Sequence, residues 1–135
     1  MKSIFLLPIF LLCFTKSDNN LKCIDFKTGK FELVNSKNNR KFIIERYTEF
    51  QTEITYNLES GEKISGPRFF KIKWTSDCEY NLLVDTIKSK YDSTDVYINS
   101  KGGLNSKILK IENECATVNT IFEDMNVESK ICKIK

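Results

Sequence analysis

The 135-residue chain contains no histidine. Histidine is the side chain that most often serves as a general base, and it is a common zinc ligand. Its absence excludes Ser-His and Cys-His nucleophilic sites as well as histidine-based metal sites. We therefore expect a protein that is not an enzyme, with no catalytic residue, no cofactor and no metal.

A strong charge of either sign is also missing. The chain has 21 Lys and Arg residues against 18 Asp and Glu residues, a net charge of +3. Such a balance is too weak to predict a nucleic-acid partner, which would require many basic contacts to phosphate. Lys71 and Lys73 do alternate with aromatic residues, but alternation places the aromatic rings on the opposite face of the strand. Bases could not stack there beside the lysines, so no nucleic-acid binding is expected.

Only one long apolar run is present, from Ile4 to Phe14, and it is shorter than the roughly 20 residues of a membrane-spanning helix. Lys2 precedes this run, and the small residues Thr15 and Ser17 follow it. This order is typical of a secretory signal peptide, and we predict one at residues 1–17. A buried N-terminal strand or a short membrane anchor remains the alternative. The mature chain would be exported to the periplasm, the cell envelope or the medium, and would have no transmembrane span.

Cys13 lies inside the apolar run and allows lipid attachment as a second interpretation. A lipoprotein signal places the modified cysteine after a small residue, whereas the bulky Leu12 precedes Cys13. We therefore predict that Cys13 leaves with the signal, and keep lipid anchoring as the less favoured alternative.

Four cysteines follow the predicted signal: Cys23, Cys78, Cys115 and Cys132. An even number in an exported chain predicts two disulfides, for which three connectivities exist. Cys115 and Cys132 lie at equal distances from a predicted hairpin turn at Glu123-Asp124. They would therefore face each other across the two strands, within disulfide range. A metal site made of all four is disfavoured because no Cys-x-x-Cys pair exists.

The rest of the chain alternates between apolar and polar residues, as half-buried strands do. In residues 50–58 the alternation predicts that Phe50, Ile54, Tyr56 and Leu58 face the core. In residues 70–75 it predicts the same for Phe70, Ile72 and Trp74. Further strands are expected at residues 30–35, 42–47, 80–84, 96–98, 108–111, 116–122 and 127–134. A helical turn is expected only within residues 85–93.

About nine short strands separated by turn residues, among them those at 65–67, predict a single all-β domain over residues 18–135. We expect an antiparallel meander that forms a small lipocalin-like barrel or a sandwich, stapled by disulfides. Many of the residues expected to face inward are large, so a filled interior competes with one that is open to a ligand.

Three residues are candidates for ligand binding: Arg46, Glu53 and Trp74. An Arg46–Glu53 pair inside a barrel would orient a ligand carboxylate, but the favoured interpretation is an ion pair at the surface or rim. The acidic residues Asp77 and Glu79 are interpreted as a solvated face beside a disulfide.

Two motifs show a resemblance to a known family. Residues 23–31 read CIDFKTGKF and residues 74–82 read WTSDCEYNL. This resembles a family of small exported bacterial proteins, many of them lipoproteins, with the pattern CxDFKTGxF…WxxDCEYxL. The resemblance covers about residues 23–84 and implies that Cys23 pairs with Cys78.

Members of that family are often labelled "DNA topoisomerase IV", but the family has no established activity. A type II topoisomerase needs an ATP-binding domain, a metal-binding domain and a tyrosine that attacks DNA, and this chain has no room for them. The Gly-x-aromatic start of the first strand, Gly29-Lys30-Phe31, looks like that of lipocalins. We therefore expect a non-enzymatic binding module for a small apolar ligand. The alternative is a structural or interaction protein of the bacterial cell envelope, with or without a lipid anchor.

Overall fold

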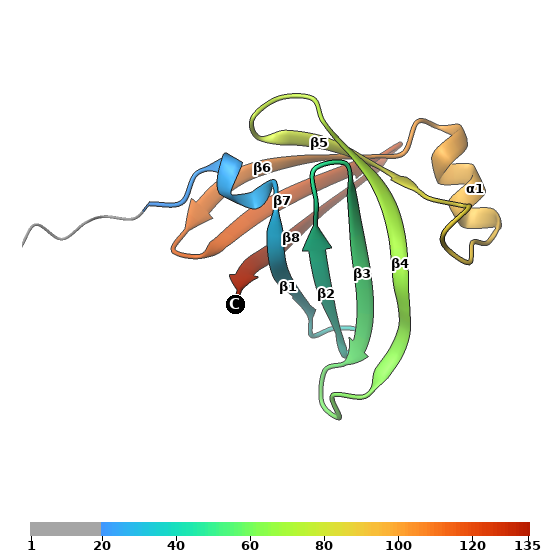
Figure 1. Cartoon of the computed structure of the whole chain (residues 1–135), viewed down its shortest axis with the longest axis horizontal. Helices are drawn as coiled ribbons and strands as arrows, with labels where there is room; N and C mark the ends of the chain where they lie inside the picture. Colours follow the sequence, from blue (N-terminus) through green and yellow to red (C-terminus); the bar gives the residue numbers. More distant parts are fainter. Residues whose placement is uncertain (1–19) are drawn as a thin grey trace, which may run out of the picture.

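The computed structural model describes residues 20–135, so the predicted signal peptide at residues 1–17 and Cys13 lie outside the described residues. Eight strands form one closed antiparallel barrel in which each strand pairs with the next, and β8 pairs with β1 (Figure 1). The strands are β1 (Gly29–Asn35), β2 (Arg40–Arg46), β3 (Phe50–Asn57), β4 (Lys63–Trp74), β5 (Glu79–Val84), β6 (Leu104–Glu112), β7 (Cys115–Phe122) and β8 (Met125–Ile134). The expected all-β meander is confirmed, and it closes as a barrel rather than a sandwich.

Two short helices accompany the barrel: the 3-10 helix η1 (Cys23–Phe26) before β1, and α1 (Ser93–Ser100) between β5 and β6. The strand expected at residues 96–98 is therefore a wrong prediction. The side chain of Asp92 accepts a hydrogen bond from the amide of Asp95 (3.0 Å), and the Asp95 side chain accepts one from the amide of Asp92 (3.1 Å). This reciprocal cap satisfies amides at the start of α1 and favours a helix there. The turn expected within residues 85–93 is present, with a hydrogen bond from Ser89 N to Asp85 O (2.9 Å).

Strand β4 runs through residues 65–67, where a turn was expected, so that prediction is also wrong. The register between β3 and β4 shifts between Glu53 and Thr55, which marks a bulge that bends the strand without ending it. Gly66 has φ +106°, and a Cβ at this position would lie 2.6 Å from the carbonyl oxygen of Glu53. Glycine is therefore required at position 66, where the backbone of β4 lies close to that of β3.

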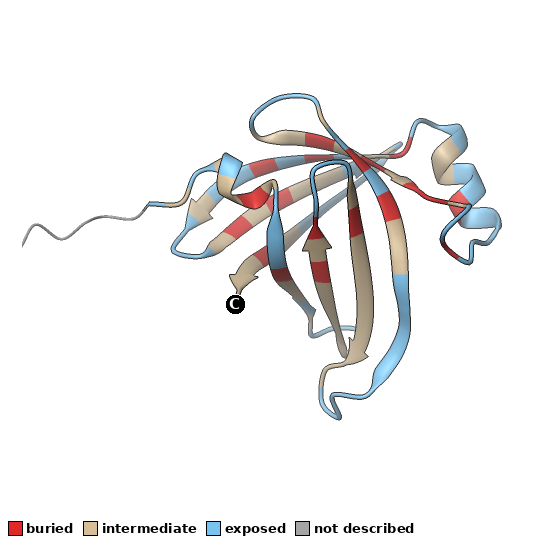
Figure 2. Ribbon diagram, in the orientation of Figure 1, coloured by how far each residue is buried: buried red, intermediate tan, exposed pale blue. Residues whose placement is uncertain are grey.

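The inward faces of the strands follow from their register. The predicted inward face of β4 is confirmed, because Phe70 and Ile72 are buried, and Tyr80 and Val84 of β5 are buried as well. Buried positions recur at intervals along the strands in Figure 2, whereas the turn between β3 and β4 is exposed. These residues form one core with Phe26 and Phe31, whose rings stack 5.5 Å apart. Through Phe26, η1 closes the end of the barrel at which β1 begins.

The predicted face of β3 is wrong. Gln51 is only 1% exposed, and its partners in the neighbouring strands are the buried residues Arg46 and Phe70. Directly opposed residues lie on the same face of a sheet, so Gln51 and Glu53 point into the barrel. The side chains that alternate with them point outward: Phe50, Ile54 and Tyr56.

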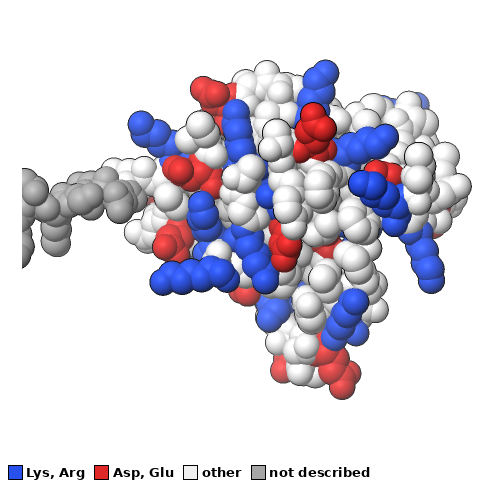
Figure 3. Space-filling view, in the orientation of Figure 1, with Lys and Arg blue, Asp and Glu red and all other residues white. Residues whose placement is uncertain are grey.

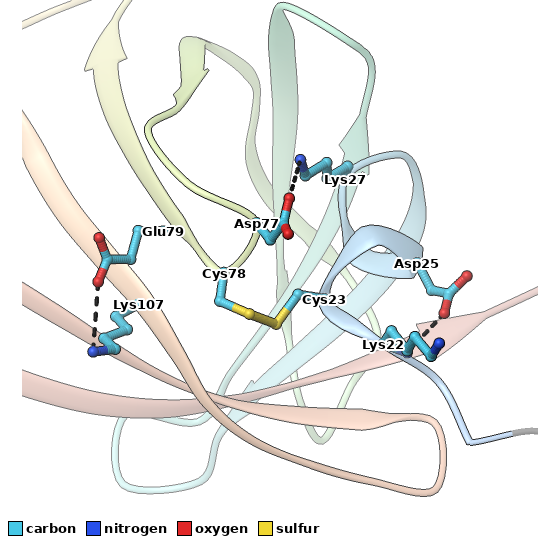
Figure 4. Close-up of a disulfide and its surroundings, with 8 residues drawn as sticks. All are labelled: Lys22, Cys23, Asp25, Lys27, Asp77, Cys78, Glu79 and Lys107. Carbon is cyan, nitrogen blue, oxygen red and sulfur yellow. Dashed lines mark hydrogen bonds and ion pairs between the residues drawn. A yellow bond between two sulfur atoms is a disulfide. The ribbon is translucent and has the colours of Figure 1, made fainter.

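Both expected disulfides are confirmed. Cys23–Cys78 joins η1 to the start of β5, with a Cα–Cα distance of 5.2 Å (Figure 4). Cys115–Cys132 joins directly opposed residues of β7 and β8, with a Cα–Cα distance of 4.0 Å. Disulfides form and persist in oxidising compartments, which agrees with an exported chain. Among the helices of residues 20–135, none is long and apolar enough to cross a membrane.

Candidate functional site

Arg46 lies in the interior of the barrel, at the end that η1 closes. It is 4% exposed, and it donates hydrogen bonds to Gln51 Oε1 (2.9 Å), the Phe26 carbonyl oxygen (3.1 Å) and Tyr80 Oη (2.8 Å). The guanidinium carbon also lies 4.5 Å from the centre of the Tyr80 ring. The expectation of an ion pair at the surface or rim is therefore wrong for Arg46. Its Nε and both terminal nitrogens are engaged by the protein, so Arg46 organises this part of the core.

Glu53 does not pair directly with Arg46, because Gln51 lies between them. The Gln51 amide nitrogen donates to Glu53 Oε1 (2.8 Å), while its carbonyl oxygen accepts from Arg46. Burial raises the pKa of Glu53, against the lowering effects of the Arg68 and Arg46 charges and of the hydrogen bond from Gln51. Arg68 forms an ion pair with Asp95 of α1. Polar side chains therefore continue from the closed end of the barrel to α1.

Trp74 points into the barrel beside Arg46 and remains partly exposed. Its ring packs against Tyr80 at a centroid distance of 4.7 Å, and the ammonium of Lys27 lies 5.3 Å from its centre. The indole Nε1 is buried and has no hydrogen-bond partner among the described residues. Trp74 also borders a depression of about 660 Å³ between η1, the β2–β3 turn and β4. The three predicted ligand-binding residues thus share the interior face, and their contact with a ligand stays a prediction.

A pocket of about 660 Å³ opens toward the other end of the barrel, and we call it the mouth pocket. The pairing of β1 with β8 stops at Leu33 and Ile131, and beyond these residues the two strands leave a gap. The lining includes Leu33, Leu104, Thr120, Phe122, Met125, Val127 and Ser129. On β6, β7 and β8 these residues alternate in register with buried residues such as Val118 and Ile131. They therefore lie on the inward face of the barrel.

Sequence reasoning did not identify the mouth pocket. Its signal was the apolar character of residues on both sides of the β7–β8 turn, where polar residues are usual. Met125 and Val127 are 59% and 54% exposed although they belong to an inward-facing row. The mouth pocket therefore presents apolar side chains to solvent within a concave surface.

Helix α1 contacts Phe122, one of the residues that line the mouth pocket. The ring of Tyr97 meets that of Phe122 edge to face, at a centroid distance of 5.8 Å. The Tyr97 hydroxyl also donates to Glu123 Oε1 (2.5 Å) in the turn between β7 and β8. The other side of α1 is attached to β5 by the Asn99 side chain, which bonds both backbone groups of Val84.

The acidic residues near the first disulfide are solvated, as expected (Figure 4). Asp77 lies 3.8 Å from Lys27, and Glu79 lies 3.5 Å from Lys107. Exposed ion pairs of this kind contribute little to stability.

Within residues 20–135, no group of three or more His, Cys, Asp and Glu residues is placed to hold a metal ion. Comparisons with protein-family models, with curated proteins and with solved structures found no match.

Proposed function

We propose that the protein is an exported, non-enzymatic binding module that holds a small apolar ligand in the mouth pocket. The observation that carries this proposal is the exposure of Met125 and Val127 inside a concave site. Apolar surface in contact with water is unfavourable, and an apolar ligand would cover it. In this interpretation the barrel is lipocalin-like in use: η1 closes one end and the ligand enters at the other.

The size and chemistry of the mouth pocket fit this role. A volume of about 660 Å³ lies within the range of roughly 300–1,000 Å³ that is usual for small-molecule sites. Thr120 and Ser129 supply hydroxyls that would orient a polar end of the ligand, and Thr120 is held by Ser106, with 2.8 Å between their oxygens. Charged side chains line only the outer part of the pocket: Lys37, Glu128 and Lys130.

Titration with an apolar fluorescent dye such as Nile red tests the proposal. Val127→Glu places a charge in the mouth pocket and should weaken dye binding by about tenfold or more, because an unpaired charge is costly in an apolar site. Ile121→Glu is the matched control: Ile121 is also exposed and lies on the outer face of β7, so binding should stay as in the wild type. Equal binding by the two variants, or no dye binding by the wild type, would overturn the proposal.

The natural ligand is to be sought by native mass spectrometry of protein purified from its own host. An apolar molecule that is present in wild-type protein and absent from Val127→Glu protein supports the mouth pocket. Arg46, Glu53 and Trp74 would then be positioning residues for the barrel, or would contact the innermost part of the ligand.

The proposed location is the periplasm, the cell envelope or the medium, on the strength of the signal-like residues 1–17 and the two disulfides. A role in the envelope is the second candidate function. Ile87 and Tyr91, exposed apolar and aromatic side chains beside α1, favour it, because such side chains are suited to contact with another surface.

A further inference from the structure

The segment between β5 and α1 carries an exposed group of apolar and basic side chains. Ile87 is 90% exposed and Tyr91 is 55% exposed. Lys88 and Lys90 lie between them in the chain and are also exposed. Isolated apolar residues on a surface are ordinary, but here two of them flank two lysines in five residues. This combination is typical of side chains that meet a membrane interface.

A basic pocket lies directly beside this segment. It has a volume of about 500 Å³, and its lining includes Ile64, Arg68, Lys88 and Lys90 but no acidic residue. Arg68 is already paired with Asp95, whereas no acid within residues 20–135 lies at ion-pair distance from Lys88 or Lys90. Neither lysine is therefore held in an ion pair, although the Lys88 ammonium lies 5.3 Å from the centre of the Phe50 ring and 5.9 Å from that of Phe69. Both lysines line an opening large enough for a phosphate group.

The acidic side chains nearby, Asp85, Asp92 and Asp95, are hydrogen-bonded within the protein, and Asp85 and Asp95 are also buried. Asp85 accepts hydrogen bonds from the backbone amides of Ile87 and Lys88, at 3.0 and 3.1 Å. Asp92 caps α1, and Asp95 is held by Arg68. Basic side chains project from this part of the molecule in Figure 3. The corner thus offers cations and apolar groups outward, while Asp85 and Asp95 are buried and Asp92 is its exposed anion.

We propose that this corner, made of Ile64, Arg68, Ile87, Lys88, Lys90 and Tyr91, docks the protein onto an anionic lipid surface. Ile87 and Tyr91 enter the interfacial region, and Lys88 and Lys90 contact lipid phosphates. Transfer of the Ile87 and Tyr91 side chains out of water is favourable, and each lysine is attracted by the negative surface potential of the lipid. An acidic protein partner would satisfy the lysines but would leave the most exposed apolar side chain without a comparable environment, so a lipid surface fits better.

The docking corner lies at the same end of the barrel as the mouth pocket. Helix α1 contacts both, through Asp95 with Arg68 on one side and Tyr97 with Phe122 on the other. Docking would therefore bring the mouth pocket toward the bilayer, where apolar molecules dissolve. The docking itself does not require an occupied pocket, so it stands or falls separately from the proposed ligand binding. It rests on the same residues as the second candidate function, the role in the envelope.

Co-sedimentation of the exported, disulfide-bonded protein with vesicles tests the proposal. We expect binding to vesicles of phosphatidylglycerol with phosphatidylcholine, weaker binding to phosphatidylcholine alone, and a loss of binding as salt is raised. The double variant Lys88→Gln/Lys90→Gln should lower the partition coefficient by about 30-fold. Ile87→Ser should lower it by about tenfold while leaving the charge unchanged.

Two controls on β6 match these changes. Lys107→Gln/Lys110→Gln removes the same charge elsewhere, and Leu109→Ser removes an exposed apolar side chain elsewhere. Both should bind vesicles within about twofold of the wild type, since they leave the corner intact. An absence of binding to the anionic vesicles, or equal losses in the controls, would overturn the proposal, as would capture of an acidic protein without vesicle binding. Nile red binding measured without vesicles reports separately on the mouth pocket.

Discussion

Arg46 donates a hydrogen bond to the hydroxyl oxygen of Tyr80 across the interior of the barrel, at 2.8 Å. The two residues are 34 positions apart, and their strands β2 and β5 are not neighbours in the sheet. Because Tyr80 is buried as well, the bond joins opposite walls of the barrel in an environment with little water. Interactions of this kind hold a closed barrel in one arrangement.

Replacement of Arg46 should destabilise the protein strongly. Arg46→Met removes the donors to the Tyr80 hydroxyl and to the side-chain carbonyl oxygen of Gln51, both buried, and should lower the free energy of unfolding by about 3 kcal/mol. Urea denaturation followed by circular dichroism measures this change. Arg40→Met is the control, because the Arg40 side chain bonds carbonyls of the adjacent turn, and its cost should be about 0.5 kcal/mol. Equal losses in the two variants would contradict the structural role of Arg46.

Glu53 should make stability fall with rising pH. Burial raises its pKa above the ordinary glutamate value, so the folded state binds this proton more tightly than the unfolded chain. The stability linked to that proton is complete below the ordinary pKa and is lost as pH rises through the raised pKa. Glu53→Gln cannot ionise. It should therefore be more stable than the wild type at neutral pH, and the difference should shrink toward acid pH.

Asp85 should have the opposite effect to Glu53 on the pH dependence of stability. Its pKa is lowered, first by the hydrogen bond from the Lys88 amide and further by that from Ile87, which outweigh burial. The stability from this carboxylate is present above the ordinary aspartate pKa and is lost as pH falls through the lowered value. Asp85→Asn should thus be less stable than the wild type at neutral pH, with the difference vanishing in acid. Unfolding measured over a pH series for both variants checks the two signs, and parallel curves for Glu53→Gln and wild type would refute the first.

The two disulfides should stabilise the protein to different degrees. The Cys23–Cys78 link closes the longer loop, with a sequence separation of 55 against 17 for Cys115–Cys132. Loop-closure entropy then gives losses of about 4 and about 3 kcal/mol when each pair is replaced by serine. Removal of the first should also free η1, so cleavage by trypsin after Lys27 should become faster in that variant alone. Identical proteolysis of both variants would show that η1 is held by other contacts.

Trp74 should contribute packing rather than a hydrogen bond. Trp74→Ala should cost about 3 kcal/mol, at the lower end of the range for aromatic truncation because the ring is partly exposed. Trp74→Phe should cost only about 1 kcal/mol, since the indole nitrogen has no partner among the described residues. Tyr47→Ala, which removes an exposed ring stacked on Phe50, is the control and should also cost about 1 kcal/mol. Thermal unfolding ranks the variants, and a Trp74→Phe loss as large as that of Trp74→Ala would reveal a polar role.

Local patterns determined much of the fold. Period-two alternation located all eight strands, although it made β4 and β6 too short, and it gave the inward face of β4. The positions of Cys115 and Cys132 around a short turn determined both a strand register and a disulfide. These features depend on neighbours along the chain or on one hairpin, so the sequence by itself was sufficient for them.

Helix α1 was also encoded locally, although alternation at Val96 and Ile98 predicted a strand. The overlooked signal was the pair Asp92 and Asp95, which cap each other at the start of the helix. For so short a segment, end capping carried more weight than the two apolar residues.

Only the tertiary structure decided which face of β3 is inside. The sequence offers an apolar face, with Phe50 and Tyr56, and a polar one, with Gln51 and Glu53. The apolar face alone favours the wrong choice. Pairing with β2 and β4 places Gln51 beside Arg46, and a buried guanidinium requires such a partner. The mouth pocket likewise exists only because β1 and β8 separate beyond Leu33, a relationship between the two ends of the barrel sheet that no local pattern contains.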